Sequence, residues 1–329
     1  MNLIPVNLIT GFLGVGKTTA VRHLLSKHPS DEKWAVLVNE FGEVGVDGAL
    51  LAEQGVLVQE VAGGCLCCVA APAFTTGLNR VIRRHRPDRI LIEPSGLGHP
   101  AQVLDTLTGP LYQQSLEVQA SICLMDARHL ASSRHRAHPN FQDQIHLADV
   151  LVANKTDLCT RDDTLAFERF AAQLRPAKKK VGYVEQGMID PSWLHLGRSK
   201  GRQAAFPEAH AFLIENSLQT EPSPAVPNHD WLLIEGSGDG YQRAGWIIQQ
   251  QGPWSSAGLA ALIDALPMER KKGLFLTDHG WLVVNQSLWS PTGAPEDGRS
   301  RLELIHPEPL DAGMIDSQLK GLAGSVATQ

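Results

Sequence analysis

The sequence predicts an α/β fold, with a mostly parallel sheet flanked by helices and a smaller α+β domain after it. At 329 residues, the chain is longer than one hydrophobic core usually organises, which favours two domains. Up to about residue 195, short runs rich in Val, Ile and Leu alternate with amphipathic segments of helical length. Several of these runs lack polar alternation, which is typical of strands buried on both faces of a parallel sheet.

We expect the first domain to span residues 1–200. Its predicted strands are PVNLIT, WAVLVNE, VLVQEV, RILIEPS, ASICLMD and DVLVANK, and its predicted helices are AVRHLLSKH, TTGLNRVIRRH and TLAFERFAAQL. Residues 201–230 are predicted to be a linker, because EPSPAVPNHD carries three prolines in ten residues. Residues 231–329 are predicted to form the second domain, with strands in YQRAGWIIQQ, KGLFLTD, GWLVVNQ and RLELIH and helices in SSAGLAALIDALP and DAGMIDSQLKGLA.

Composition disfavours two classes of partner. Lys and Arg total 29 against 35 for Asp and Glu, and the net charge of -6 is spread along the chain, so we expect no binding to nucleic acid or to an anionic membrane. No apolar run is long enough to cross a bilayer, and the N-terminal residues lack a basic leader, so we expect a cytoplasmic protein. In that reducing compartment, five cysteines favour thiolate chemistry over structural disulfides.

The segment GFLGVGKT at residues 11–18 predicts a phosphate-binding loop. It matches the P-loop pattern G-x-x-x-x-G-K-[ST] and stands between a predicted strand and a predicted helix. Backbone N–H groups near Gly14, Val15 and Gly16 are expected to face phosphate oxygens at the positive end of that helix. Lys17 is expected to reach the β- and γ-phosphates and Thr18 to ligate Mg²⁺. The full set of P-loop residues expected to contact nucleotide is Gly11, Gly14, Val15, Gly16, Lys17, Thr18 and Thr19; the alternative is a glycine-rich turn without a ligand.

Two further segments follow predicted strands, where such sheets bind ligands. In ANKTD, Asp157 can accept hydrogen bonds from the N1–H and 2-amino groups of guanine, a donor pair that adenine lacks. Asn154 is expected at the other edge of the base, with the Lys155 stem over the ring. In RILIEPSG, Glu93 is expected to face the Mg²⁺ shell and the Gly96 N–H to touch the γ-phosphate. The alternatives are an Asn-Lys turn and a surface glutamate.

The segment GGCLCC at residues 63–68 holds three of the five cysteines. Thiolates favour Zn²⁺ or Cu⁺ over hard cations. Cys65, Cys67 and Cys68 cannot easily close a tetrahedral site on so short a segment, which leaves a coordination position open and the metal exchangeable. The alternative roles for these cysteines are redox chemistry and ordinary packing.

Taken together, TGFLGVGKTT, VNEFGEVGVDG, GGCLCC, LIEPSGLGHP and ADVLVANKTD resemble the CobW family of P-loop GTPases, and the similarity is strongest to its zinc-binding branch. It continues more loosely through AGWIIQQ, ERKKG and SRLELI. The resemblance implies a GTPase that carries zinc on the Cys-x-Cys-Cys motif and passes it to a zinc-requiring client apoprotein. It also implies that Glu40 joins the zinc ligands and that Asp47 approaches Mg²⁺ beside Thr18 and Glu93.

These assignments predict a link between nucleotide and metal. Glu40 lies in a glycine-punctuated segment that is expected to sense the γ-phosphate, so GTP and zinc affinities should depend on each other. The sequence leaves three alternative functions: insertion of a different ion such as cobalt, regulation with a structural zinc, and a small-molecule kinase, against which NKTD counts. Whether the chain forms a homo-oligomer that depends on zinc or nucleotide is left open.

Three weaker signals complete the sequence expectations. His135 and His138 in RHRAHP are expected in a solvated loop, with metal binding as the lesser alternative because Arg134 and Arg136 would oppose a cation. LRPAKKKVGYV occupies the place of a final guanine-contacting loop but contains no clear motif. Four tryptophans of the second domain fit either a client-binding face or its core: Trp246, Trp254, Trp281 and Trp289.

Overall fold

The computed structural model describes residues 3–39, 57–61, 71–97, 100–204, 230–238, 240–249, 252–295 and 298–326. They fall into two compact units, the first containing the described residues up to 204 and the second those from 230 onward. Each unit is described by itself. Most of the predicted linker lies in residues 205–229, outside the described residues, so the boundaries 1–200, 201–230 and 231–329 stay predictions.

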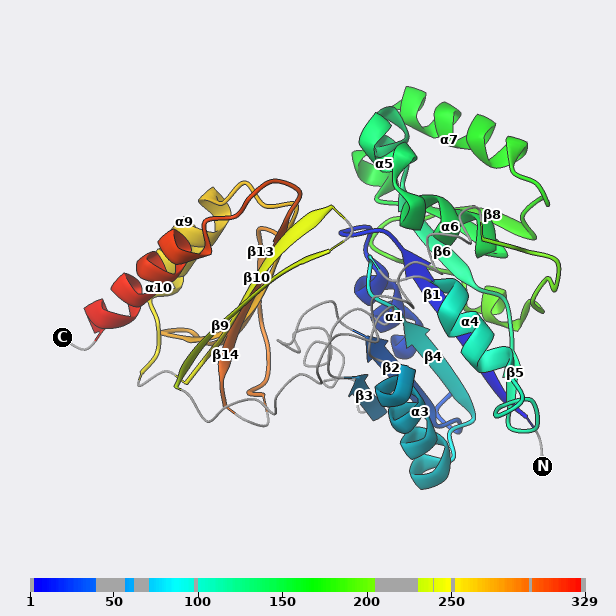
Figure 1. Ribbon diagram of the computed structural model, residues 1–329, viewed down its shortest axis with the longest axis horizontal. Helices are drawn as coiled ribbons and strands as arrows, with labels where there is room; N and C mark the ends of the chain where they lie inside the picture. Colours follow the sequence, from blue (N-terminus) through cyan, green and yellow to red (C-terminus); the bar gives the residue numbers. More distant parts are fainter. Residues whose placement is uncertain are drawn as a thin grey trace. The chain divides into compact units, whose positions relative to one another are not determined.

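The first unit is built on a parallel sheet (Figure 1). Its strands follow the order β3-β2-β4-β1-β6-β7-β8, and β5 also pairs with β1. Every pairing among these strands is parallel, which confirms the predicted mostly parallel sheet. The strands are β1 (Ile4–Gly11), β2 (Trp34–Asn39), β3 (Leu57–Val61), β4 (Arg89–Glu93), β5 (Leu116–Val118), β6 (Ile122–Asp126), β7 (Val150–Asn154) and β8 (Lys180–Tyr183).

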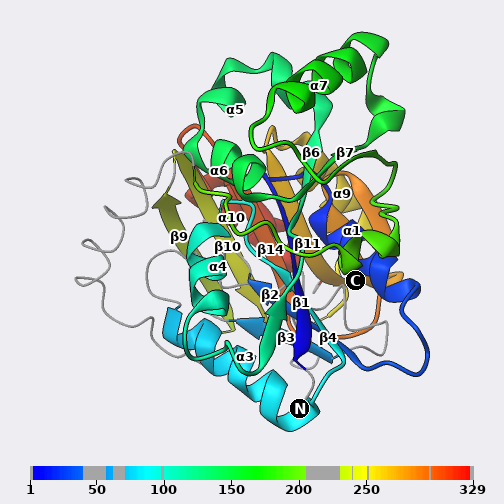
Figure 2. The same cartoon turned by 90° about the vertical axis from the view of Figure 1, so that its right-hand side faces the viewer.

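Helices cover both faces of this sheet. Figure 2 shows α3 and α4 on one side of β1 and β4 and α1 on the other. Apolar side chains of α3 and α4 pack with Val6 and Leu8 of β1 and with Ile90 and Ile92 of β4, because alternate residues of a buried strand point to opposite faces. The helices of this unit are α1 (Lys17–Ser26), α3 (Ala71–His85), α4 (Pro100–Thr108), η1 (Ala127–Ala131), α5 (Ser133–Ala137), α6 (Pro139–Leu147), η2 (Thr156–Leu158), α7 (Arg161–Gln173) and η3 (Pro191–His195).

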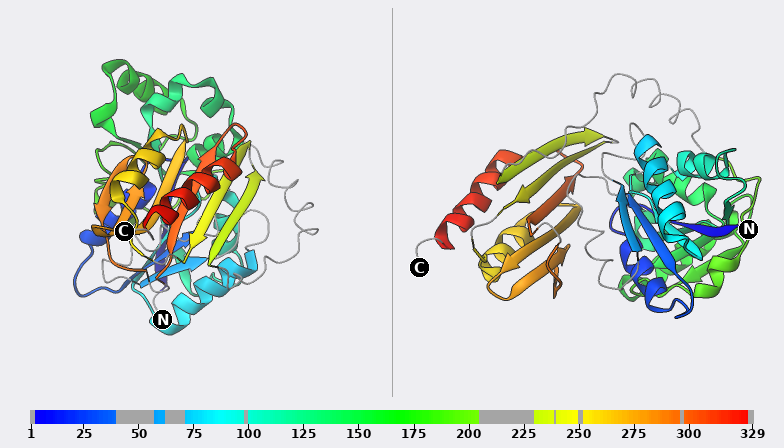
Figure 3. Two further views of the ribbon diagram at one scale, coloured as in Figure 1. Left: turned by 90° about the vertical axis from the view of Figure 1, so that its left-hand side faces the viewer. Right: turned by 90° about the horizontal axis from the view of Figure 1, so that it is seen from below.

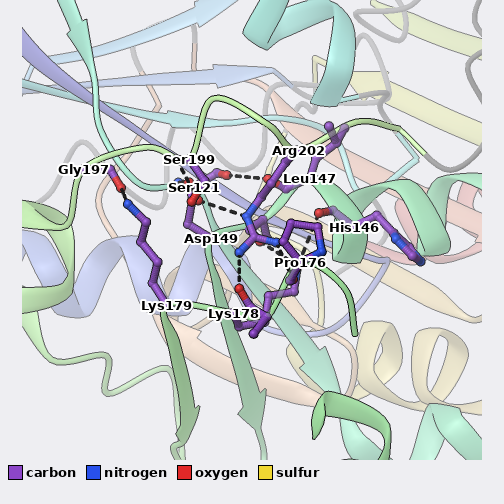
Figure 4. Close-up of polar contacts among 12 residues, drawn as sticks. Ser121, His146, Leu147, Asp149, Pro176, Lys178, Lys179, Gly197, Ser199 and Arg202 are labelled. Carbon is purple, nitrogen blue, oxygen red and sulfur yellow. Dashed lines mark hydrogen bonds and ion pairs between the residues drawn. The ribbon is translucent and has the colours of Figure 1, made fainter. Parts of the chain in front are cut away.

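A buried polar network closes the amino end of β7 (Figure 4). The fully buried Asp149 accepts hydrogen bonds from the backbone N–H groups of Ser121 and Ser199 and from Nε of Arg202, at 3.3, 3.0 and 3.0 Å. Lys178 Nζ donates to the carbonyl oxygens of the last turn of α6 and of the residue after it, Ile145, His146 and Ala148. The network therefore fastens residues 199–202 to the sheet at the end opposite to the loops that follow the strands.

The described residues of the second unit form an antiparallel sheet with the helices α9 and α10 on one face (Figure 3). Its strand order is β13-β12-β11-β14-β10-β9. Trp246 and Trp254 are buried in the core beneath the helices. Of the two alternatives for these tryptophans, a place in the core therefore fits both better than a client-binding face. No helix among the described parts of either unit has the length and apolar character to span a bilayer. The elements are β9 (Trp231–Gly238), β10 (Tyr241–Ile248), α9 (Ser256–Ala265), β11 (Arg270–Thr277), β12 (Gly280–Asn285), β13 (Leu288–Pro291), β14 (Ser300–His306) and α10 (Ala312–Val326).

Candidate nucleotide site at the carboxyl ends of the strands

The loop between β1 and α1 has the backbone of an anion cradle. Gly11, Gly14 and Gly16 have φ values of 141°, 68° and 95°, a region that residues with side chains rarely adopt. A Cβ on Gly16 would lie only 2.5 Å from Nδ2 of Asn154, so a side chain has no room there. Gly16 caps α1 without a side-chain hydrogen bond, and the first turn of α1 carries no acidic residue. The positive end of the helix is thus available to an anion.

Lys17, Thr18 and Glu93 come together beside this loop. Lys17 Nζ donates to the Phe12 carbonyl oxygen at 3.2 Å, and Thr18 Oγ1 donates to Glu93 Oε1 at 2.8 Å. They meet because β4 is the sheet neighbour of β1, so Glu93 at its carboxyl end lies beside the start of α1. All three side chains are at least nine-tenths buried. A hydroxyl and a carboxylate side by side are the oxygen donors that Mg²⁺ prefers, so this pair fits that ion.

Gly96 lies against the same loop. A Cβ built on it would stand 3.0 Å from both Lys17 Nζ and the Leu13 backbone nitrogen. Glycine therefore permits the loop after β4 to approach the lysine that is expected to hold the terminal phosphates.

The residues of the NKTD segment differ in their surroundings: Asn154 is buried between two loops, and Asp157 faces solvent. Asn154 is 1% exposed; its Nδ2 donates to the Val15 carbonyl oxygen at 2.8 Å, and its Oδ1 accepts from the Gly187 N–H at 2.9 Å. Each polar end of this amide makes one hydrogen bond to backbone, so the side chain joins two loops. The second N–H and the second lone pair stay available, and the expected base contact stays a prediction. Asp157 lies in η2 and is exposed, which leaves its carboxylate accessible to a base.

A charged network that sequence reasoning missed supports Lys155. Asp126 ends β6 opposite Asn154, which ends β7, and it is 1% exposed. Its carboxylate accepts from Nε and Nη2 of Arg128 at 2.8 and 2.6 Å, and Lys155 Nζ lies 3.8 Å from it. Burial by itself raises the pKa of Asp126, but the hydrogen bonds from Arg128 and the nearby cations outweigh it and hold that pKa below its usual value. Lys155 also has a left-handed backbone, with φ 60°.

A second missed element is the loop after β8, at residues 184–187. The Val184 carbonyl oxygen accepts from the N–H and the hydroxyl of Thr156 at 3.3 and 3.2 Å. A Cβ on Gly187 would lie 2.6 Å from the Ala20 backbone nitrogen of α1. Packed against both NKTD and the P-loop helix, this loop begins at the last residue of LRPAKKKVGYV. It is therefore the candidate for the final guanine-contacting loop, which stays a prediction. The Gln-Gly pair at residues 186–187, shortly after β8, is the signal that could have located it.

Comparison with known proteins decides the family. Residues 5–182 match the family described as CobW/HypB/UreG, nucleotide-binding domain. Over 321 residues the chain is 39% identical to the protein named Zinc chaperone YeiR of Escherichia coli K12, covering 95% of this chain and 96% of that protein. The chain belongs to the CobW/HypB/UreG family of P-loop GTPases. The resemblance found from the motifs, and the α/β fold class that it implies, are thereby confirmed.

Other members extend the comparison. The Zinc chaperone CobW of Pseudomonas aeruginosa is 33% identical over 220 residues, which cover 56% of this chain and 58% of that protein. Among solved structures, the Zn(II)-bound YjiA GTPase from E. coli is 23% identical, with 98% of this chain and 99% of that chain covered and a TM-score of 0.44.

In this CobW-family chain, the predicted zinc ligands lie outside the described residues. Cys65, Cys67, Cys68 and Glu40 belong to that group, as does the predicted Mg²⁺ residue Asp47. Within the described ranges, no three His, Cys, Asp or Glu side chains are grouped so as to hold a metal ion.

The expectation of a solvated loop around His135 and His138 is confirmed only for the solvent exposure of Arg134 and Arg136, because the segment is helical and its histidines are packed. His135 lies in α5, and His138 caps α6 by accepting the Asn140 N–H at 3.2 Å. Both rings pack edge-on against Phe12 of the P-loop, with centroids 5.4 and 4.9 Å away, and His135 also stacks on His129 at 4.1 Å. The histidines are held by an aromatic side chain that is distant in sequence, a contact that no local pattern reveals.

The two described cysteines are free thiols with little tendency to ionise. Cys123 is buried in β6, and burial raises its pKa to about 11. Burial and the neighbouring Asp126 also raise the pKa of Cys159, whose Sγ donates to the Lys155 carbonyl oxygen. Neither thiol has the character of a metal-binding thiolate.

Proposed function

We propose that this chain is a zinc-binding GTPase that acts as a zinc chaperone. It hydrolyses GTP to GDP and phosphate, holds zinc at the Cys-x-Cys-Cys motif, and transfers the ion to a zinc-requiring client apoprotein. The observation that carries this proposal is the 39% identity, along 95% of the chain, to a protein named Zinc chaperone. The buried contact between Thr18 and Glu93 beside the uncapped end of α1 supports the nucleotide half of it.

The nucleotide chemistry follows from the described site. The N–H groups at the start of α1 bind phosphate oxygens, and Lys17 exchanges its contact with the Phe12 carbonyl for the β- and γ-phosphates. Thr18 and Glu93, with Asp47, would hold Mg²⁺, which when bound neutralises charge on the phosphates. At the other end, Asp157 accepts the two guanine donors while the Lys155 stem packs over the ring.

Zinc is the cargo in this proposal. Cys65, Cys67 and Cys68 supply thiolates, and Glu40 supplies a carboxylate ligand that favours zinc over copper. Since Glu40 and Asp47 share one segment of sequence, a change in the terminal phosphate changes the zinc ligand set. Reciprocal linkage then requires that zinc alters the preference for GTP over GDP by the same factor.

Calorimetric zinc titration with GDP and with a non-hydrolysable GTP analogue tests this function. We expect one zinc per chain and affinities that differ by about tenfold between the two nucleotides, within the usual range of allosteric coupling. Cys67→Ala should abolish tight zinc binding and leave GTP affinity nearly intact, whereas the control Cys159→Ala should change neither. Light scattering on the same samples reads any homo-oligomer that depends on zinc or nucleotide.

Three results would count against zinc delivery. Equal zinc affinity with both nucleotides would remove the coupling. Zinc that resists chelators in both nucleotide states would indicate a structural ion in a regulatory GTPase. Tighter binding of cobalt or nickel than of zinc in the same titration would indicate a chaperone for another ion.

A further inference from the structure

One face of α6 carries polar side chains that are almost completely buried. Asn140, Asp143 and Gln144 are 1%, 0% and 2% exposed. Burying amide groups is unfavourable unless they are hydrogen-bonded, so a helix rarely turns such residues inward without a specific partner. The partners of two of them lie in the loop that follows β4.

The two amides hold successive carbonyl groups of that loop. Gln144 Nε2 donates to the Gly96 carbonyl oxygen at 2.9 Å, and Asn140 Nδ2 donates to the Leu97 carbonyl oxygen at 2.7 Å. Between them, the Leu97 N–H donates to the hydroxyl of Ser95 at 3.3 Å. The two peptide groups after Gly96 are therefore fixed by side chains.

The same helix also contacts the other wall of the phosphate site. Phe141, between the two amides, packs edge-on against Phe12 of the P-loop with centroids 5.9 Å apart. His138, which caps α6, packs against the same ring. Consequently α6 sets the position of the Gly96 loop relative to the P-loop.

The hydrogen bonds from α6 matter because nothing in the Gly96 residue itself fixes the direction of its N–H. A glycine has no Cβ to restrict its backbone angles, so contacts of its neighbours have to fix the direction of its N–H. That N–H belongs to the peptide group before Gly96, and the hydrogen bond from the Leu97 N–H to the Ser95 hydroxyl ties this side of Gly96 to the peptide groups held by Gln144 and Asn140. The close approach of Gly96 to Lys17 Nζ and Leu13 places it where the terminal phosphate of GTP is expected and GDP has no atoms. A loss of anchoring would then weaken binding of GTP more than binding of GDP.

We propose that Gln144 and Asn140 are positioning residues that aim the Gly96 N–H at the γ-phosphate and thereby set the preference of this protein for GTP over GDP. The inference rests on the proposed guanine-nucleotide site. It assigns to α6 a role in nucleotide discrimination that is separate from metal binding.

Gln144→Met tests the proposal, because it keeps the length of the side chain and removes the amide donor. Affinities for fluorescent GDP and for a fluorescent non-hydrolysable GTP analogue are measured in the full chain with excess Mg²⁺. We expect about fivefold weaker binding of the GTP analogue, the usual net effect of one lost hydrogen bond, with GDP binding within about twofold of wild type. The matched control is Gln142→Met on the same helix, whose Nε2 donates to the Arg136 carbonyl oxygen away from the loop, and it should change neither affinity.

The ratio of the two affinities separates positioning from simple support of the fold. An equal loss for both nucleotides, or an unchanged ratio, overturns the proposal. Should Gln144→Met fail to fold, Asn140→Ala removes only the Leu97 contact and is judged by the same ratio. If the wild-type chain binds no guanine nucleotide, the proposed function fails and this inference falls with it, whereas an unchanged ratio in the variants overturns the inference alone.

Discussion

Replacing Asn154 by Ala tests whether the P-loop and the base-binding loops act as one structure. The substitution removes two hydrogen bonds, to the Val15 carbonyl oxygen at 2.8 Å and from the Gly187 N–H at 2.9 Å. Asn154, Val15 and Gly187 are all buried, so water cannot easily replace either bond. An unsatisfied buried group costs about 1–3 kcal/mol, and two of them predict that the free energy of unfolding falls by about 3 kcal/mol. GDP affinity should fall as well, because the Val15 backbone is no longer held in its binding conformation.

Urea denaturation of the nucleotide-free protein measures the first effect, and fluorescent GDP titration measures the second. Asn7→Ala is the control, because Asn7 is equally buried and donates to the carbonyl oxygens of Ala120 and Leu194 at 3.0 Å each. Its Oδ1 also accepts from Nη1 of the buried Arg89 at 2.6 Å. It lies in mid-strand on β1, several residues before the P-loop, so it should reduce stability by at least as much without reducing GDP affinity. A stable Asn154→Ala protein with unchanged GDP affinity would refute the view that this residue joins the loops.

Two further predictions concern the base and pH. Asp157→Asn should weaken GDP binding by about 100-fold, because two charge-assisted hydrogen bonds to the base are lost. The control Asp162→Asn, at the exposed start of α7, should have no effect on GDP binding. Competition binding with GDP, GTP and ATP measures both variants, and an Asp157→Asn protein that still rejects ATP would show that other residues recognise the base. Burial lowers the pKa of Lys178 to about 8, below its value of about 10.4 in an unfolded chain. Between about pH 8 and 10.4 the unfolded chain binds more protons than the folded chain at this group, so the group makes the free energy of unfolding rise with pH. In urea denaturation curves recorded across that pH range, a Lys178→Met variant should lack this rise. If the free energy of unfolding of the variant rises with pH as steeply as that of the wild type, Lys178 is not the group responsible.

The P-loop could be predicted from sequence because its information is local. Glycines at fixed spacing, a strand before them and a helix after them specify the φ values and the helix end seen in the structure. The same holds for β4 and Glu93, since a buried apolar run ending in a carboxylate indicates both the strand and the polar end of it. The strands β5 and β8 have only three and four residues, too few for a periodic pattern to indicate them.

The supports of the site could not be predicted because they depend on the order of strands in the sheet. Asp126 stands opposite Asn154 only because β6 pairs with β7, although 27 residues separate the two in sequence. The contact of His135 with Phe12, and of Gln144 with Gly96, likewise joins segments that no local pattern connects. A single sequence therefore indicates which groups carry the chemistry, whereas the packed structure is needed to find what holds them in place.

The structure also separates two tasks within the nucleotide site. Asn154 ties the P-loop to the loops after β7 and β8, which in the proposed site contact parts shared by GDP and GTP. By contrast, α6 holds the loop that is proposed to lie near the terminal phosphate alone. Loss of the Asn154 contacts should therefore weaken both nucleotides by the same factor, and loss of the Gln144 contact should change their ratio. Because the two sets of contacts share no residue, their effects on GTP affinity should add in the double variant. An Asn154→Ala protein that lost GTP affinity selectively would show that the two loops are mechanically coupled and that this division is wrong.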